Sequence, residues 1–112
     1  MGKRSTDNID RMVHEPARLC ILSLLSGVNE ADFASVQRTL ELTHGNLSIH
    51  IARLEAVGYV EVRKSIVGKA PRTSYRLTDA GRKALDKYWK SLAEIRSLAK
   101  VWAQPEVIFG KD

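Results

Sequence analysis

One stretch of the sequence decides the fold of this chain: Thr43-His44-Gly45-Asn46-Leu47-Ser48-Ile49-His50-Ile51-Ala52-Arg53-Leu54-Glu55-Ala56-Val57-Gly58. Leu47, Ile51 and Leu54 recur at intervals of four and three, which places them on one side of a helix. The hydroxyl of Thr43 can accept from the free amides of the first turn and so cap this helix. Gly58 ends it. The stretch therefore predicts a short helix with an apolar inner face.

The residues after this helix predict a two-stranded hairpin. Residues 59–64 alternate and are rich in β-branched side chains, as expected of a strand. Residues 65–72 contain Gly68 and Pro71 and predict a loop. Residues 73–77 alternate again, with Tyr75 and Leu77 on one face. We expect a hairpin whose loop carries cations.

Two further helices are predicted ahead of the central stretch. Apolar residues recur at helical spacing between residues 8 and 25, with Pro16 inside the run; a helix can start near this proline after a separate turn, and Gly27 ends it. A second, shorter helix follows with Asp32 as its cap. Phe33, Val36 and Leu40 form its apolar face.

A long helix is predicted at the end of the chain. Thr78 provides a hydroxyl cap and Asp79 an acid in the first turn, which suits the helix dipole. The helix is expected to run to about Ala103, where Pro105 stops it. The predicted order is α-α-α-β-β-α, a mainly α chain with a small β-hairpin (α+β).

Length and composition indicate one domain whose basic charge is unevenly distributed. The chain has 112 residues, 44% of them hydrophobic, and a formal net charge of +5. Residues 43–78 hold six Lys/Arg against two Asp/Glu, so most of the excess lies on the central helix and hairpin. Such a patch is the footprint of phosphate binding, although a solvated surface that is basic by chance is the alternative.

Membrane and secretory classes find no support. No apolar run approaches the roughly 20 residues of a membrane span, and the N-terminus lacks the apolar run of a secretory signal. A single cysteine excludes an intrachain disulfide. We expect a cytoplasmic protein without membrane partners.

The outer face of the central helix has the side chains that read DNA bases. Asn46 can pair with adenine, Arg53 can reach guanine or a phosphate, Ser48 can donate to either, and Ile49 can contact a thymine methyl. An ordinary amphipathic helix with a polar outer face is the alternative. The short preceding helix and the basic hairpin favour the DNA hypothesis.

The hairpin carries four cations on or beside its predicted loop: Lys64, Lys69, Arg72 and Arg76. Long cations on a projecting hairpin can straddle a phosphate backbone or enter a narrow minor groove. The alternative is a hairpin edge kept soluble by its charges.

Three motifs resemble small bacterial and archaeal winged-helix transcriptional regulators related to the MarR and ArsR types. They are Leu47-Ser48-Ile49-His50-Ile51, Leu54-Glu55-Ala56-Val57-Gly58-Tyr59-Val60 and Tyr75-Arg76-Leu77-Thr78-Asp79-Ala80-Gly81-Arg82, and Val13-His14-Glu15-Pro16-Ala17-Arg18-Leu19-Cys20-Ile21-Leu22 is similar to the opening of the family's first helix.

The resemblance implies a winged helix-turn-helix and a homodimer that binds double-stranded DNA, with the third helix in the major groove. It places the reading positions at Thr43, His44, Asn46, Ser48, Ile49, His50 and Arg53. The cysteine pair of ArsR-type metal sensors is absent, so no metal or other cofactor is expected.

The last helix is expected to be an assembly device. Its apolar residues recur at three and four, and one small domain needs only its first turns to close a core. The predicted dimer interface comprises Ile9, Met12, Leu85, Tyr88, Trp89, Leu92, Ile95, Leu98, Ala99 and Trp102. The alternative is that the helix folds back on its own domain.

Together these expectations divide the chain into a disordered tail (1–7), a winged helix-turn-helix (8–78), a dimerisation helix (79–104) and a C-terminal tail (105–112). No catalytic arrangement supports an enzyme. Cys20 is expected to be a buried, inert thiol rather than a redox switch.

Two alternatives stay open. The third helix can serve protein–protein docking without DNA, because Ile49, Ala52 and Ala56 lie on its outer face. A small apolar inducer can bind a dimer crevice lined by Tyr88, Trp89 and Trp102.

Overall fold

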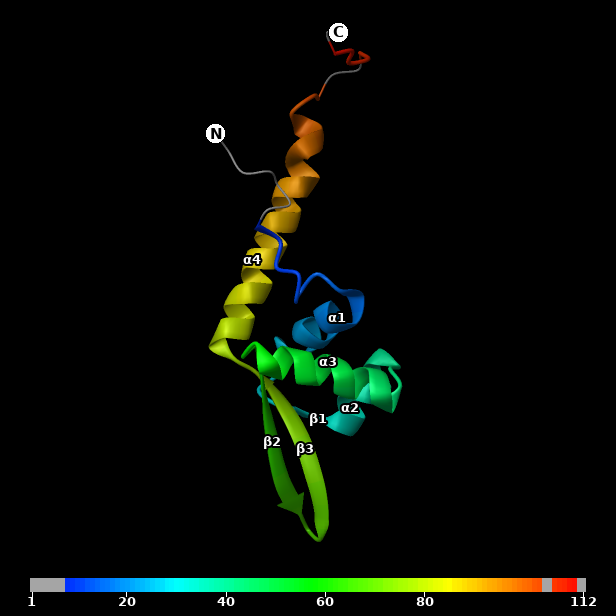
Figure 1. Cartoon of the computed structure of the whole chain (residues 1–112), viewed down its shortest axis with the longest axis vertical. Helices are drawn as coiled ribbons and strands as arrows, with labels where there is room; N and C mark the ends of the chain where they lie inside the picture. The colour runs from blue at the N-terminus through cyan, green and yellow to red at the C-terminus, as the bar shows by residue number, and fades with distance from the viewer. Residues whose placement is uncertain (1–7, 104–105, 111–112) are drawn as a thin grey trace.

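The computed structural model of the chain describes residues 8–103 and 106–110. The expected tail at residues 1–7 and the helix-stopping Pro105 lie outside the described residues. The predicted α+β class and the order of the main elements are confirmed (Figure 1). The elements are α1 (Pro16–Leu25), β1 (Ala31–Asp32), α2 (Phe33–Leu40), α3 (His44–Ala56), β2 (Val60–Val67), β3 (Ala70–Leu77), α4 (Asp79–Arg96) and the 3-10 helix η2 (Ser97–Lys100).

Each α-helix begins at a side-chain cap, and three of the four caps were predicted. Asp32, Thr43 and Thr78 accept hydrogen bonds from backbone amides three residues later, as expected. Helix α1 begins at Pro16, behind a separate turn, and its cap is the carboxylate of Glu15.

The hairpin is longer and more regular than predicted. Residues 65–72 were expected to form a loop, but β2 and β3 stay paired until Val67 opposite Ala70, leaving only Gly68 and Lys69 as the turn. Pro71 is tolerated because β1 pairs with Ser74 and Tyr75 alone, so that one edge of β3 is open at the proline. Gly68 has a positive φ of 66°, which the tight turn requires.

Strand β1 was not predicted. Its two residues pair antiparallel with β3, giving a three-stranded sheet in the order β1-β3-β2. Two residues are too few for an alternating pattern, so only the tertiary pairing defines this strand.

The core lies where α1, α3, the start of α4 and the base of the hairpin meet. Helix α1 packs against α2, α3, α4 and β3. In Figure 1 the hairpin projects from one end of this body and α4 extends from the other. The fully buried side chains are Val13, Ile21, Leu22, Leu25, Val36, Leu47 and Leu54.

Helix α4 divides into a packed half and a projecting half. Leu85 and Tyr88 lie in the core of their own domain, Tyr88 with 4% of its surface exposed, so their assignment to a dimer interface was wrong. Ile9, Met12 and Leu92 also pack against this core. The α-helix ends at Arg96 and continues as η2, short of the expected Ala103. None of the described helices is long and apolar enough to cross a membrane.

Candidate nucleic-acid interface

Helix α3 presents a polar outer face because its leucines point inward. Leu47 and Leu54 are fully buried, whereas Asn46, Ser48 and Arg53 are exposed. Within the described part of the chain, the side chains of these three residues form no hydrogen bond or ion pair. We call Asn46, Ser48, Ile49 and Arg53 the reader face. It is free to meet a ligand.

Two of the predicted reading residues at the start of α3 are already engaged. The hydroxyl of Thr43 accepts from the backbone amide of Asn46 at 3.1 Å. The ring of His44 packs against the ring of Phe33 with a centroid distance of 4.6 Å and an interplanar angle of 44°. Both residues are exposed, but their first role is to fix the start of the helix.

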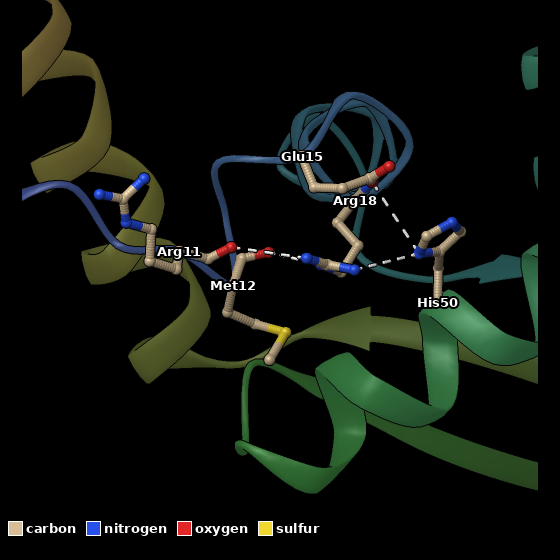
Figure 2. Close-up of polar contacts among 5 residues, drawn as sticks. All are labelled: Arg11, Met12, Glu15, Arg18 and His50. Carbon is tan, nitrogen blue, oxygen red and sulfur yellow. Dashed lines mark hydrogen bonds and ion pairs between the residues drawn. The ribbon is translucent and has the colours of Figure 1, made fainter.

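His50 was predicted to read DNA, and the structure turns one of its two ring nitrogens inward (Figure 2). Nη1 of Arg18 lies 3.3 Å from Nδ1 of His50, and Oε1 of Glu15 lies 3.9 Å from the same nitrogen. Only 17% of the His50 side chain is exposed. His50 therefore lies at the border between the reader face and α1.

We call β2, β3 and their turn the wing. Its cations differ in whether an acidic side chain pairs with them. Arg72 pairs with Asp32 at 3.8 Å and Arg76 with Glu61 at 3.2 Å. Lys64 and Lys69 have no ion pair among the described residues. Exposed pairs of this kind contribute at most about 1 kcal/mol, so a phosphate can compete for both arginines.

The strand register distributes these cations over both faces of the wing. Directly paired residues share a face, and faces alternate along a strand. Lys64 pairs with Thr73 on the face that continues the core, whereas Arg72 and Arg76 pair with Ser65 and Glu61 on the opposite face. The four predicted wing residues thus do not form one patch.

Sequence reasoning missed three features of this surface. Arg63 pairs with Glu30 at 3.2 Å, which brings an acid from the loop before β1 onto the wing. Ile66, near the wing turn, has 75% of its surface exposed. Arg18 is buried. The sequence could have indicated this, because Arg18 lies three residues before Ile21 and four before Leu22 and so shares their apolar helix face. A cation on such a face needs partners.

Cys20 was expected to be buried, but it is exposed. It lies beside a hollow of about 430 Å³ between the start of α1, the α2–α3 turn and α3. Asn46, His50 and Glu15 also line this hollow, so the border of the reader face is concave.

A family model described as a winged helix DNA-binding domain matches residues 17–96. The chain belongs to this family. The match spans the winged-helix protein from α1 to the end of α4, so it includes the reader face and the wing. The expectation of a winged-helix DNA-binding domain is confirmed.

Known proteins similar to the winged-helix protein include an uncharacterized protein of Methanocaldococcus jannaschii. That protein is 34% identical over 90 residues, which cover 80% of this chain and 95% of the relative. A solved structure of a transcriptional regulator homologue from Pyrococcus horikoshii OT3 is 33% identical, with a TM-score of 0.73. It covers 79% of this chain and 87% of that one.

The expected relation of the winged-helix protein to the MarR and ArsR types is not confirmed. A PadR family transcription regulator from Clostridium difficile R20291 shares the fold, with a TM-score of 0.66 over 80% of this chain and 100% of that one. Its identity is 15%, so this match shows the fold alone.

Proposed function

We propose that this protein is a transcriptional regulator that binds specific double-stranded DNA as a homodimer. Helix α3 enters the major groove, and the wing contacts the backbone or the minor groove. The observation that carries the proposal is the reader face, whose polar side chains have no partner in the described part of the chain and stand beside a basic hairpin. The similarity to a transcriptional regulator homologue supports it.

The two surfaces have separate roles in this proposal. Asn46, Ser48, Ile49 and Arg53 contact base edges and supply sequence discrimination. Lys64 and Lys69 contact phosphates and supply affinity for any duplex, with Arg72 and Arg76 joining when phosphate displaces their carboxylate partners.

The dimer uses the projecting half of α4 and η2. Trp102 is 65% exposed and Leu98 50%, and Trp89, Ile95 and Ala99 lie on the same segment. Tryptophan and leucine side chains gathered at the end of a projecting helix are typical of an interface. Two-fold pairing of α4 would place two copies of α3 about one DNA turn, roughly 34 Å, apart.

The test begins with selection of bound duplexes from a random pool, followed by titration of selected and scrambled duplexes at several salt concentrations. Affinity should fall steeply with salt. Arg53→Ala should reduce the ratio between selected and scrambled duplexes by about tenfold or more, while Lys69→Ala should weaken both equally. Equal behaviour of the two variants would refute the separate roles.

A docking module without DNA binding remains the second candidate, because Ile49 is 53% exposed on the outer face of α3. Such a module should elute early from heparin and shift no duplex at any salt concentration. Retention on heparin that falls with salt supports the DNA proposal instead.

A further inference from the structure

Among the residues that the structure describes, no carboxylate pairs with the guanidinium of the buried Arg18. Arg18 is 8% exposed, and Nε donates to the carbonyl of Met12 at 2.6 Å while Nη2 donates to the carbonyl of Arg11 at 3.4 Å. Nη1 donates to Nδ1 of His50 at 3.3 Å. Figure 2 shows that these contacts meet at the guanidinium of Arg18, between the segment before α1 and helix α3.

The contact with Arg18 determines which nitrogen of His50 carries the proton. A guanidinium has five N–H donors and no acceptor, so Nδ1 of His50 must be the acceptor. A neutral imidazole that accepts at Nδ1 carries its hydrogen on Nε2.

We propose that Arg18 is a positioning residue for DNA reading, which holds His50 in the tautomer that offers an Nε2–H donor to an acceptor on a base edge. This inference rests on the proposed function. His50 lies one turn after Asn46 on α3, and both line the hollow of about 430 Å³ at the border of the reader face. The donor at Nε2 therefore extends the set of base-contacting groups toward α1.

A base edge fits this donor better than a phosphate does. The carboxylate of Glu15 lies 3.9 Å from Nδ1 of His50 and lines the same hollow. A phosphate placed there would meet this negative charge, whereas the N7 of a purine, O6 of guanine or O4 of thymine is a neutral acceptor. The charged groups that face His50 are Arg18 and Glu15 at the start of α1.

The first test needs no DNA. Long-range proton–nitrogen NMR spectra of the full chain with labelled histidine report the tautomer of His50, with His14 and His44 as internal references. Wild type should show the Nε2–H tautomer at pH 8, and Arg18→Met should give a mixture. An Nδ1–H tautomer in wild type, or an unchanged spectrum in a folded Arg18→Met, overturns the inference. If Arg18→Met fails to fold, Arg18→Gln, whose side-chain amide can either donate or accept, serves for the same comparison.

The second test separates the two nitrogens of His50 on DNA. The side-chain oxygen of Asn can replace Nδ1, so His50→Asn keeps the bond to Arg18 but lacks the outer donor. The His50→Asn variant should keep the melting temperature of the wild type. Its discrimination between a selected duplex and single-base variants of that duplex should fall about tenfold. His50→Gln, whose amide reaches the position of Nε2, should retain more discrimination.

The outcomes are distinct from failure of the proposed function. If His50→Asn lowers the affinity for all duplexes equally, His50 contacts a phosphate and not a base edge. If the variant binds every duplex as the wild type does, the Nε2–H donor has no role in binding. Wild type that binds no duplex selectively overturns the proposed function and the reading role of His50, while the spectrum still decides the role of Arg18.

Discussion

The hydroxyl of Tyr59 donates a hydrogen bond to Oδ2 of Asp10, which joins the turn after α3 to the segment that precedes α1. This bond, together with burial and the negative charge of Asp10, raises the pKa of Tyr59 to about 12. The backbone carbonyl of Tyr59 also accepts from the amide of Thr78, the cap of α4. Tyr59 thus connects the end of α3 with the segment before α1 and with the start of α4.

The Tyr59–Asp10 bond should make stability depend on alkaline pH. Because the folded pKa lies above the value of about 10 for an unfolded tyrosine, the contribution is complete below pH 10 and is lost as pH rises through about 12. Urea unfolding at pH 8 and pH 11 should show a larger loss of unfolding free energy in wild type than in Tyr59→Phe. An identical loss in both proteins would contradict this role.

Gly81 should resist replacement although it lies in a helix. A Cβ at this position would stand 2.2 Å from the carbonyl oxygen of Tyr59 and 2.7 Å from Cδ1 of Leu77. Gly81→Ala should therefore lower the unfolding free energy by about 1–3 kcal/mol, against the usual gain from alanine in a helix. The matched control is Gly45→Ala on α3, which meets nothing within 4 Å and should be neutral or stabilising. Similar melting shifts in the two variants would show that the contact at Gly81 relaxes without cost.

Asp32 should stabilise the start of α2 through the negative charge of its carboxylate and through the hydrogen bond that its oxygen accepts. Hydrogen bonds from Ser35 are the main cause that lowers the pKa of Asp32 below its usual value of 3.8. The stabilisation is therefore present above about pH 4 and lost as pH falls through the folded value. Asp32→Ala should cost about 1 kcal/mol at pH 7 in thermal or urea unfolding, and Asp32→Asn, which can still cap, should cost less. Equal costs would place the effect in the ion pair with Arg72 instead.

The projecting end of α4 should decide the oligomeric state. Leu98→Glu introduces a charge into the proposed dimer interface and should give a monomer in sedimentation at micromolar concentration. Ala80→Glu makes the same change in charge at an exposed position in the first turn of α4 and should leave the dimer intact. A monomeric wild type at this concentration would refute the dimer itself.

Local signals predicted the helices well. The caps Asp32, Thr43 and Thr78 and the spacing of Leu47, Ile51 and Leu54 depend on residues within one or two turns, so the sequence contains what determines them. The exposure of Asn46 and Arg53 follows from the same spacing.

What the sequence did not reveal depends on contacts between distant segments. Strand β1 exists because Ala31 meets Tyr75, and the position of His50 depends on Arg18, 32 residues earlier. Cys20 was expected to be buried because its neighbours are apolar, but the exposed side of α1 passes through its position. Such outcomes are set by how the helices pack together, which spacing within one helix does not specify.

The hairpin is anchored at its base, where Val60, Tyr75 and Leu77 enter the core and β1 pairs with β3. From Lys64 to the turn and back to Arg72, all side chains are exposed. This outer half therefore projects from a packed base. In the proposed complex, a small rotation at the base would move Lys69 through a wide arc while α3 stays in place, and the wing would then follow duplexes of differing groove width.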